Sequence, residues 1–249
     1  MAWTRTLLRA KSRVLGIHGG ISALLFLPLL YLVWFQWFPP PLFFTDGGWQ
    51  GVRILLVVHV VIGPALSFLI FDPAKTRLAL AVDFTCIAIA QAAALAYGSV
   101  AIESKRPLVL AFHEGRFVAV TKDRYSTQTI GADEWQRLGK GPPYWAFARA
   151  PATSQEQAGV TAFGVLEGQA PEQLFFLHEP LANRWPMVQR QAMPADDLAK
   201  LDPELAGRLH ELRARHGQIR LFLLAGHYRD AWLVLDAEGR YLDALYANR

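Results

Sequence analysis

Residues 14–38 read VLGIHGGISALLFLPLLYLVWFQWF, a stretch without a single Asp, Glu, Lys or Arg. At about 1.5 Å per helical residue, a segment of this length exceeds the ~30 Å hydrocarbon core of a bilayer. A secretory signal would have a shorter apolar region followed by a small-residue cleavage site, whereas PPPL follows here at residues 39–42. The stretch therefore predicts an uncleaved membrane span.

Two further apolar runs, at residues 52–71 and 78–98, also have spanning length. The first carries only Arg53 at its edge, and the second contains one acid, Asp83. The link at 72–77 is too short to be more than a tight turn at a membrane surface. We therefore predict a three-helix transmembrane region over residues 14–98, with spans at about 14–38, 52–71 and 78–98.

The charges indicate how these spans are oriented. The chain carries a formal charge of +4, and the seven Lys and Arg residues and three acidic residues before residue 99 account for all of it. Because the remainder is neutral, the composition argues against a nucleic-acid partner. Four basic residues precede the first span, two lie in the 72–77 turn and none in the 39–51 loop. By the positive-inside rule, residues 1–13 are cytoplasmic and residues 99–249 lie outside, in the periplasm if the membrane is a bacterial inner membrane.

Polar side chains within the predicted spans need partners, because an ionisable group at mid-membrane costs roughly 2.5–3.5 kcal/mol on insertion scales. His18 and Asp83 lie at a similar depth near the cytoplasmic side, and His59 and Gln91 lie at a similar depth nearer the outer side. We therefore expect the pairs His18–Asp83 and His59–Gln91.

Small residues recur at helical spacing in all three spans. Gly16 and Gly20 lie four residues apart in the first span, and such positions allow close helix approach. The members in the other two spans are His59, Gly63 and Ser67 in the second, and Ala79, Ala90, Ala94 and Gly98 in the third. Two interpretations stay open: these positions only hold the spans together, or they also accept a partner's helix.

The outer region has the pattern of an α+β domain with a mostly antiparallel sheet. A hairpin is expected at 107–113 and 116–121, joined by Glu114-Gly115, and a three-stranded meander closes the chain. The other expected elements are a helix at 132–138, strands at 144–149 and 173–177, a weak segment at 153–167, a helix at 195–216, and the meander strands 219–225, 231–236 and 240–246.

No catalytic or metal-binding pattern emerges from the outer region. His210 and His216 are six residues apart and so fall on different faces of one helix, and the single cysteine, Cys86, lies in an apolar run. We therefore predict neither an enzyme nor a cofactor or metal site. A membrane-anchored periplasmic ligand-binding or sensor protein is the alternative, although the short cytoplasmic segments leave little room for an output domain.

Residues 44–53, FTDGGWQGVR, resemble the signature of the TfpX/TfpZ family of type IV pilin accessory proteins. The resemblance covers about residues 15–121 and implies an inner-membrane protein that binds a type IV pilin and supports its stability or assembly without an enzymatic step. The further residues that carry it are His59, Gly63-Pro64, Phe71-Asp72-Pro73, Lys75, Asp83, the segment from Gln91 to Gly98, and Arg106-Pro107.

The residues allow a physical version of this role, as a hypothesis, with a partner-binding surface in two places. One is the helix face around Gly16 and Gly20 with His18, which could offer a hydrogen bond to the glutamate that pilins carry near the start of their membrane helix. The other is the loop between the first two spans, with Asp46, Gly47, Gly48, Trp49, Gln50 and Arg53. A second interpretation of the loop is a turn pinned at the membrane surface, in which Asp46 meets Arg53.

Overall fold

The computed structural model describes residues 2–246 and divides into two compact units. The helical unit comprises the chain up to Pro39 together with Gly48–Glu103. The sheet unit comprises Pro40–Gly47 together with the chain from Ser104 onward. The connector between the first two predicted spans therefore groups with the sheet unit.

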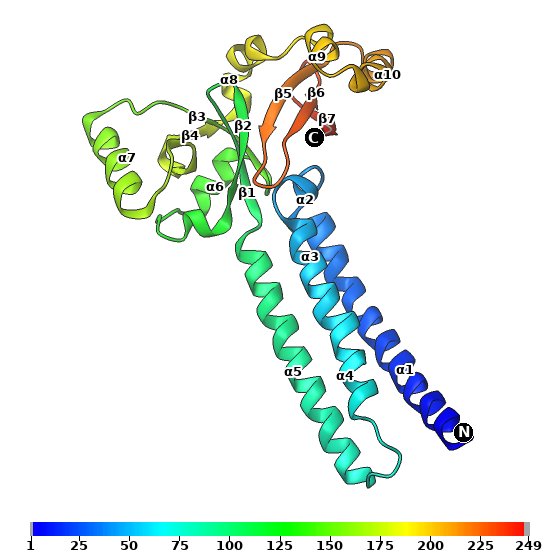
Figure 1. Ribbon diagram of the computed structural model, residues 1–249. Helices are drawn as coiled ribbons and strands as arrows, with labels where there is room; N and C mark the ends of the chain where they lie inside the picture. Colours follow the sequence, from blue (N-terminus) through cyan, green and yellow to red (C-terminus); the bar gives the residue numbers. More distant parts are fainter. Residues whose placement is uncertain (1, 247–249) are drawn as a thin grey trace. The chain divides into compact units, whose positions relative to one another are not determined.

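Three helical stretches make up the helical unit (Figure 1). The first is α1 (Ala2–Leu32) with a π-helical end at Val33–Trp37, and the third is α5 (Arg77–Ser104). The second runs without a break through α3 (Gly48–Leu56), a π-helical segment (Val57–Ile62) and α4 (Gly63–Ile70). Within the described residues, Arg5–Trp37, Gly48–Ile70 and Arg77–Ser104 are long and apolar enough to cross a membrane, so the three predicted spans are confirmed by length and composition.

Glycines mark the points where these helices approach one another. A Cβ on Gly51 would lie 2.8 Å from Ile102, one on Gly98 would overlap Leu55, and one on Gly63 would overlap Gln91. Lipid tails are as apolar as the side chains, so close backbone approach and hydrogen bonds must hold such helices together. Of the small residues predicted to form a stripe, Gly63 in the second span and Gly98 in the third therefore lie at helix contacts, whereas Ala79 and Ala90 are exposed.

A seven-stranded sheet forms the sheet unit, in the order β4-β3-β1-β2-β5-β6-β7. Four joins are antiparallel, namely β1–β2, β3–β4, β5–β6 and β6–β7, but β1 pairs with β3 and β2 pairs with β5 in parallel. The sheet is thus mixed, and the expectation of a mostly antiparallel sheet was wrong on these two joins. The strands are β1 (Pro107–His113), β2 (Arg116–Thr121), β3 (Tyr144–Ala148), β4 (His178–Pro180), β5 (Arg220–Ala225), β6 (Ala231–Leu235) and β7 (Tyr241–Tyr246).

Both faces of the sheet are covered. Along β1, Leu110 and Phe112 point to the side of α8 (Leu181–Val188), whereas Val109 and Ala111 point to the side of α6 (Ala132–Leu138). This alternation follows from the two-residue period of a strand. Helices α9 (Ala195–Leu201) and α10 (Ala206–His216) add a further apolar cluster against β5, β6 and β7.

Three expected elements differ from the structure. The single helix expected at 195–216 is broken at Pro203, where Asp202 accepts a hydrogen bond from the Glu204 N–H at 3.2 Å, because proline cannot continue the first helix. Residues 173–177 form short 3₁₀ turns rather than a strand. The weak segment at 153–167 is a well-formed helix, α7 (Ser154–Glu167).

Candidate functional site

A hydrogen-bonded polar cluster connects all three helices of the helical unit. His18 on α1 lies with Nδ1 2.6 Å from the Ser67 hydroxyl on α4 and with Nε2 2.7 Å from the Gln91 Oε1 on α5. The Gln91 amide nitrogen in turn donates to the backbone carbonyl of His59 at 3.0 Å. One histidine therefore bridges two neighbouring helices, and Gln91 extends the chain of hydrogen bonds.

The chemistry of these groups fixes the direction of each bond. A carbonyl oxygen only accepts, so the amide nitrogen of Gln91 faces His59 and its oxygen faces His18. His18 must then donate from Nε2, and in the neutral imidazole Nδ1 accepts from the Ser67 hydroxyl. Both ring nitrogens of His18 are thus engaged, while Gln91 keeps one N–H and one lone pair.

The two pairs expected from depth alone need correction. Asp83 forms an ion pair with Lys75 at 2.7 Å, so the expected His18–Asp83 pair was wrong. His59 does meet Gln91, but through its backbone carbonyl; its side chain is 5% exposed, and neither ring nitrogen has a partner within residues 2–246. The sequence pattern indicates Ser67 only as a small residue of the second span. In the structure its hydroxyl is the partner of His18 Nδ1.

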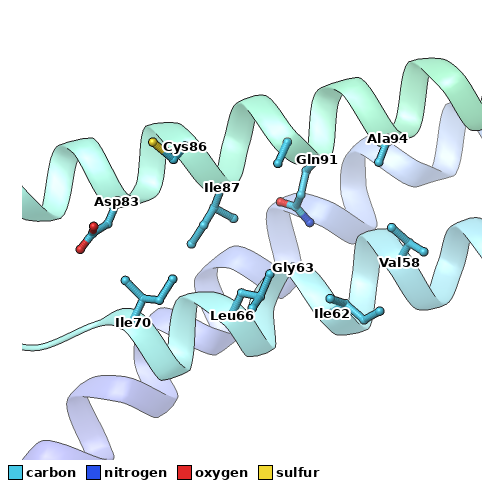
Figure 2. A pocket seen from close by; sticks show the side chains of 11 residues that line it. Val58, Ile62, Gly63, Leu66, Ile70, Asp83, Cys86, Ile87, Gln91 and Ala94 are labelled. Carbon is cyan, nitrogen blue, oxygen red and sulfur yellow. The ribbon is translucent and has the colours of Figure 1, made fainter.

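A groove lies beside this cluster, between α4 and α5 (Figure 2). It has a volume of about 450 Å³. One wall is the row Val58, Ile62, Leu66 and Ile70, at four-residue steps, and the facing wall includes Ile87, Ala90 and Ala94. Figure 2 shows the Gln91 amide between the two helices and Asp83 near one end of the groove. The groove therefore combines apolar walls with an amide that has hydrogen-bonding capacity to spare.

Gly16 and Gly20 lie on a different surface from His18. Each glycine is two positions from His18 along α1, which corresponds to a rotation of about 200° around the helix axis. Both glycines therefore point away from the face that carries His18. Within the described chain no atom beyond α1 comes within 4 Å of a Cβ placed on either glycine, whereas Gly19 approaches Pro64 at 3.8 Å. The three residues expected to act together are therefore not brought together, and the Gly16–Gly20 face is open.

The connector between the first two spans is pinned to the sheet unit. The short helix α2 (Leu42–Thr45) places Leu42 in the core of the sheet unit, and the Thr45 carbonyl accepts from the Tyr228 N–H at 2.8 Å. Gly47 has φ +105°, and a Cβ there would lie 2.9 Å from the Tyr228 ring. The connector is thus an integral part of the sheet unit, docked on the β5–β6 turn.

Asp46 is the buried polar residue of this connector. Its carboxylate accepts from the Thr45 hydroxyl at 2.6 Å and from the His227 N–H at 3.4 Å. Burial raises the pKa of Asp46 to about 6, against the lowering effect of these two donors, and nearby Asp230 raises it further. Arg53, the partner expected from sequence, belongs to the helical unit.

The other loop residues named from sequence are spread over different environments. Gly48 is buried at the start of α3, Trp49 is 44% exposed, and Arg53 is exposed. The Gln50 side-chain oxygen is buried without a hydrogen-bond partner among the described residues. Within residues 2–246 no group of three or more His, Cys, Asp or Glu side chains is placed to hold a metal ion.

Comparison with known proteins relates part of the chain to proteins named for fimbrial assembly in Dichelobacter nodosus. The chain is 30% identical to the fimbrial assembly protein of serogroup E1 over 101 residues, which is 41% of this chain and 39% of that protein. It is 28% identical to the serogroup I protein over 111 residues, 45% of this chain and 43% of that protein. For the protein of serogroups C1 and C2 the identity is 29% over 101 residues, 41% of this chain and 77% of that protein.

The match thus spans less than half the length of the first two relatives. No family model and no solved structure matches the chain.

Proposed function

We propose that this chain is an inner-membrane accessory protein of type IV pilus assembly, which holds a pilin subunit by its membrane helix before the subunit joins a pilus. The names of the three relatives support a role in fimbrial assembly, and the three membrane-length helices support a membrane location. The observation that carries the binding role is the α4–α5 groove, because it offers apolar walls on two membrane-length helices together with the Gln91 amide.

The groove suits a single apolar helix. Its walls present branched side chains on α4 and the small Ala90 and Ala94 on α5, so a neighbouring helix could pack its own side chains closely against α5. A polar group on the incoming helix would meet Gln91 rather than His18, because both ring nitrogens of His18 are already engaged. The pilin glutamate is our candidate for that group.

The arrangement also supports the expected orientation. Lys11 approaches the Leu69 carbonyl at 3.3 Å, and Lys75 approaches the Ile70 carbonyl at 3.3 Å, so both basic segments lie at one end of the helical unit. Residues 45–47 contact the β5–β6 turn and must lie on the same side of the membrane as the sheet unit. These contacts, together with the positive-inside rule, support the proposal that the N-terminus and the 72–77 turn are cytoplasmic and the sheet unit periplasmic.

The test is pilin co-purification with a groove-filling variant and a matched control. Ala90→Trp places an indole in the groove, whereas Ile89→Trp places one on the neighbouring, 65% exposed position outside it. With the pilin of the same source co-expressed, we expect Ala90→Trp to lower the recovered pilin at least fivefold and Ile89→Trp to leave it near the unmodified level. Equal recovery from both variants would reject the groove as the pilin site.

A second comparison separates the two units. Bulky replacements at Gly16 and Gly20 test the open face of α1, and replacement of the sheet unit tests its share of the binding. If pilin recovery is lost on replacing the sheet unit but unaffected by every change in the helical unit, the membrane half of the proposal is wrong.

A further inference from the structure

The chain passes between the helical unit and the sheet unit at one edge of the sheet. β1 begins at Pro107, three residues after α5 ends at Ser104. β2 runs antiparallel to β1 and so ends at the same edge, and β5 pairs with β2 in parallel, so the β5–β6 turn (residues 226–230) also lies there. The connector contacts this turn and ends at Gly47, directly before α3. Figure 1 shows the start of β1 and the β5–β6 turn at the same end of the sheet.

The lengths of the membrane helices place this edge at the level of the lipid headgroups. Gly48–Ile70 has 23 residues and Arg77–Ser104 has 28, which correspond to about 34 Å and about 42 Å of helix. The hydrocarbon core of a bilayer is ~30 Å thick, and the whole bilayer with its headgroups is ~40–45 Å thick. With the 72–77 turn at the opposite surface of the membrane, Gly47 and Lys105 therefore lie in the headgroup region or at its outer boundary.

Aromatic side chains at this edge fit that depth. Tyr228 is 49% exposed, and its ring lies against Gly47, where an added Cβ would approach it to 2.9 Å. Phe44 in the connector is partly exposed and packs edge to face on Tyr246, with ring centroids 6.0 Å apart. Tyrosine and tryptophan gather at membrane interfaces because each combines an apolar ring with a hydrogen-bonding group. Tyr228, together with the exposed Trp49 at the start of α3, therefore has the character of an interfacial anchor.

The same edge concentrates basic side chains. We call residues 105–106, 122–124 and 226–230 the basic edge. The Lys122 N–H donates to the Arg106 carbonyl at 2.9 Å, which ties the second segment to the first. Of the 18 basic and 18 acidic residues after position 98, five basic and two acidic ones lie in these ten residues. The five basic residues are Lys105, Arg106, Lys122, Arg124 and Arg229.

The acidic residues leave the basic edge with an excess of positive charge. Asp123 forms an ion pair with Lys105 at 2.6 Å, and Asp230 accepts from the Gly226 N–H at 3.2 Å. Glu103, in the last turn of α5, is a third acidic residue next to this edge. Five basic residues therefore face three acidic ones here, although the chain after position 98 is neutral as a whole.

We infer that the basic edge binds the phosphate groups of anionic phospholipids in the adjacent leaflet. Lys122 and Arg124 are exposed, and the guanidinium of Arg229 lies 4.9 Å from the centroid of the Tyr246 ring. A guanidinium matches a phosphate with two parallel N–H donors, and lysine adds a point charge. Basic residues are attracted to anionic lipids only within about a Debye length, ~8 Å at physiological salt, and the headgroup depth satisfies this condition. The lipid contact holds the sheet unit at the membrane surface whether or not a pilin is bound.

Quenching of a fluorescent label by headgroup nitroxides tests this inference on the full-length chain. Cys86, the only cysteine, is replaced by serine, and the label is attached at Ser126→Cys beside the basic edge or at Glu114→Cys at the opposite edge of the sheet. The vesicles contain phosphatidylcholine alone or equal parts of phosphatidylcholine and phosphatidylglycerol, with the nitroxide on phosphatidylcholine headgroups in both. We expect quenching at position 126 to be at least twofold stronger with phosphatidylglycerol, and quenching at position 114 to be weak in both lipids.

Two triple variants of equal charge change assign the effect to the basic edge. The test variant combines Lys122→Gln, Arg124→Gln and Arg229→Gln. The matched control changes three exposed arginines outside the edge and combines Arg116→Gln, Arg190→Gln and Arg215→Gln. The test variant should bring quenching at position 126 down to its level in phosphatidylcholine alone, and the control should keep the enhancement.

The comparison of the two lipids uses the unmodified basic edge and so does not depend on how the triple variants fold. Equal quenching at position 126 with and without phosphatidylglycerol, equal quenching at positions 126 and 114, or an equal loss in the two triple variants would overturn the inference. A loss of pilin recovery in the test variant without any dependence on the lipid would also overturn it and assign the basic edge to the pilin.

Discussion

The two units of this protein differ in how far their side chains are buried. In the sheet unit, Phe112, Phe117 and Phe222 are each 1% exposed or less and pack edge to face, with centroids 5.1–5.6 Å apart. In the helical unit, α5 has 28 described residues, of which just Ile87 and Ile102 are buried. The sheet unit is thus held by removal of apolar surface from water, and the helical unit by glycine contacts and one polar cluster. The same kind of substitution should therefore have a large effect on stability in the sheet unit and a small one in the helical unit.

The largest difference is expected for a large-to-small change. Phe222→Ala in the sheet unit should lower its free energy of unfolding by about 3–5 kcal/mol, because it leaves a cavity among buried rings. Leu69→Ala in the helical unit, at a 68% exposed position, should change stability little, since lipid replaces the lost contacts. Denaturant unfolding in mild detergent, followed by tryptophan fluorescence, measures both. Similar losses in the two variants would contradict the comparison.

A smaller effect is expected from Asp46 in the sheet unit, because burial of its carboxyl disfavours the charged form and costs free energy of folding. Burial raises its pKa from the ordinary value of 3.8 to about 6, so folding favours the protonated form. The contribution of the protonated Asp46 carboxyl to the stability of the folded state is therefore present below about pH 4 and is lost as the pH rises through 6. Asp46→Asn, which stays neutral, should therefore stabilise the sheet unit at pH 8 by up to about 3 kcal/mol at 1.36 kcal/mol per pKa unit.

The pH dependence of this difference is the control. The advantage of Asp46→Asn over the unmodified chain should shrink between pH 7 and pH 4 and vanish below pH 4. A constant difference across this range would mean that the carboxyl is ionised with an ordinary pKa.

Next in size is the glycine contact of the helical unit. Gly63→Leu should separate α4 from α5, since even a Cβ at this position overlaps Gln91, and the polar cluster would be lost. We expect a cost of about 1–2 kcal/mol, the range for interhelical hydrogen bonds in membranes. Spin labels at Leu69 and Ile89 would report a longer and broader distance. Gly16→Leu, on the open face, is the matched control and should leave that distance unchanged.

The smallest effect is expected for a single bond of the cluster. Ser67→Ala removes the donor to His18 Nδ1 but leaves the bond from His18 to Gln91, so the cost should be about 0.6 kcal/mol. His18→Leu removes both bonds and should cost more. Thermal unfolding in detergent ranks the two variants, and a larger loss for Ser67→Ala would contradict the role of His18 as the bridge between Ser67 and Gln91.

Local patterns predicted local structure well. The hairpin strands expected at 107–113 and 116–121 are β1 and β2, and the helix expected at 132–138 is α6, because turn residues and strand periodicity are short-range signals. The parallel joins β1–β3 and β2–β5 could not be predicted, since nothing within a strand's own sequence states which distant strand lies beside it.

The candidate site was predicted in part. Depth in the membrane placed His59 near Gln91 but paired His18 with Asp83, because depth leaves out the rotation of each helix about its axis. That rotation also separates His18 from Gly16 and Gly20. The docking of the connector on the β5–β6 turn depends on residues some 180 positions away along the chain, and no sequence pattern indicated it.

The central claim is that the α4–α5 groove receives a pilin helix, and photo-crosslinking in living cells tests it most directly. A benzophenone amino acid at Ala90 lies in the groove, and the same group at Ile89 lies outside it. With the pilin co-expressed, we predict a covalent adduct with pilin from position 90 and little or none from position 89. Adducts of equal yield from both positions, or adducts from position 89 alone, would contradict the claim.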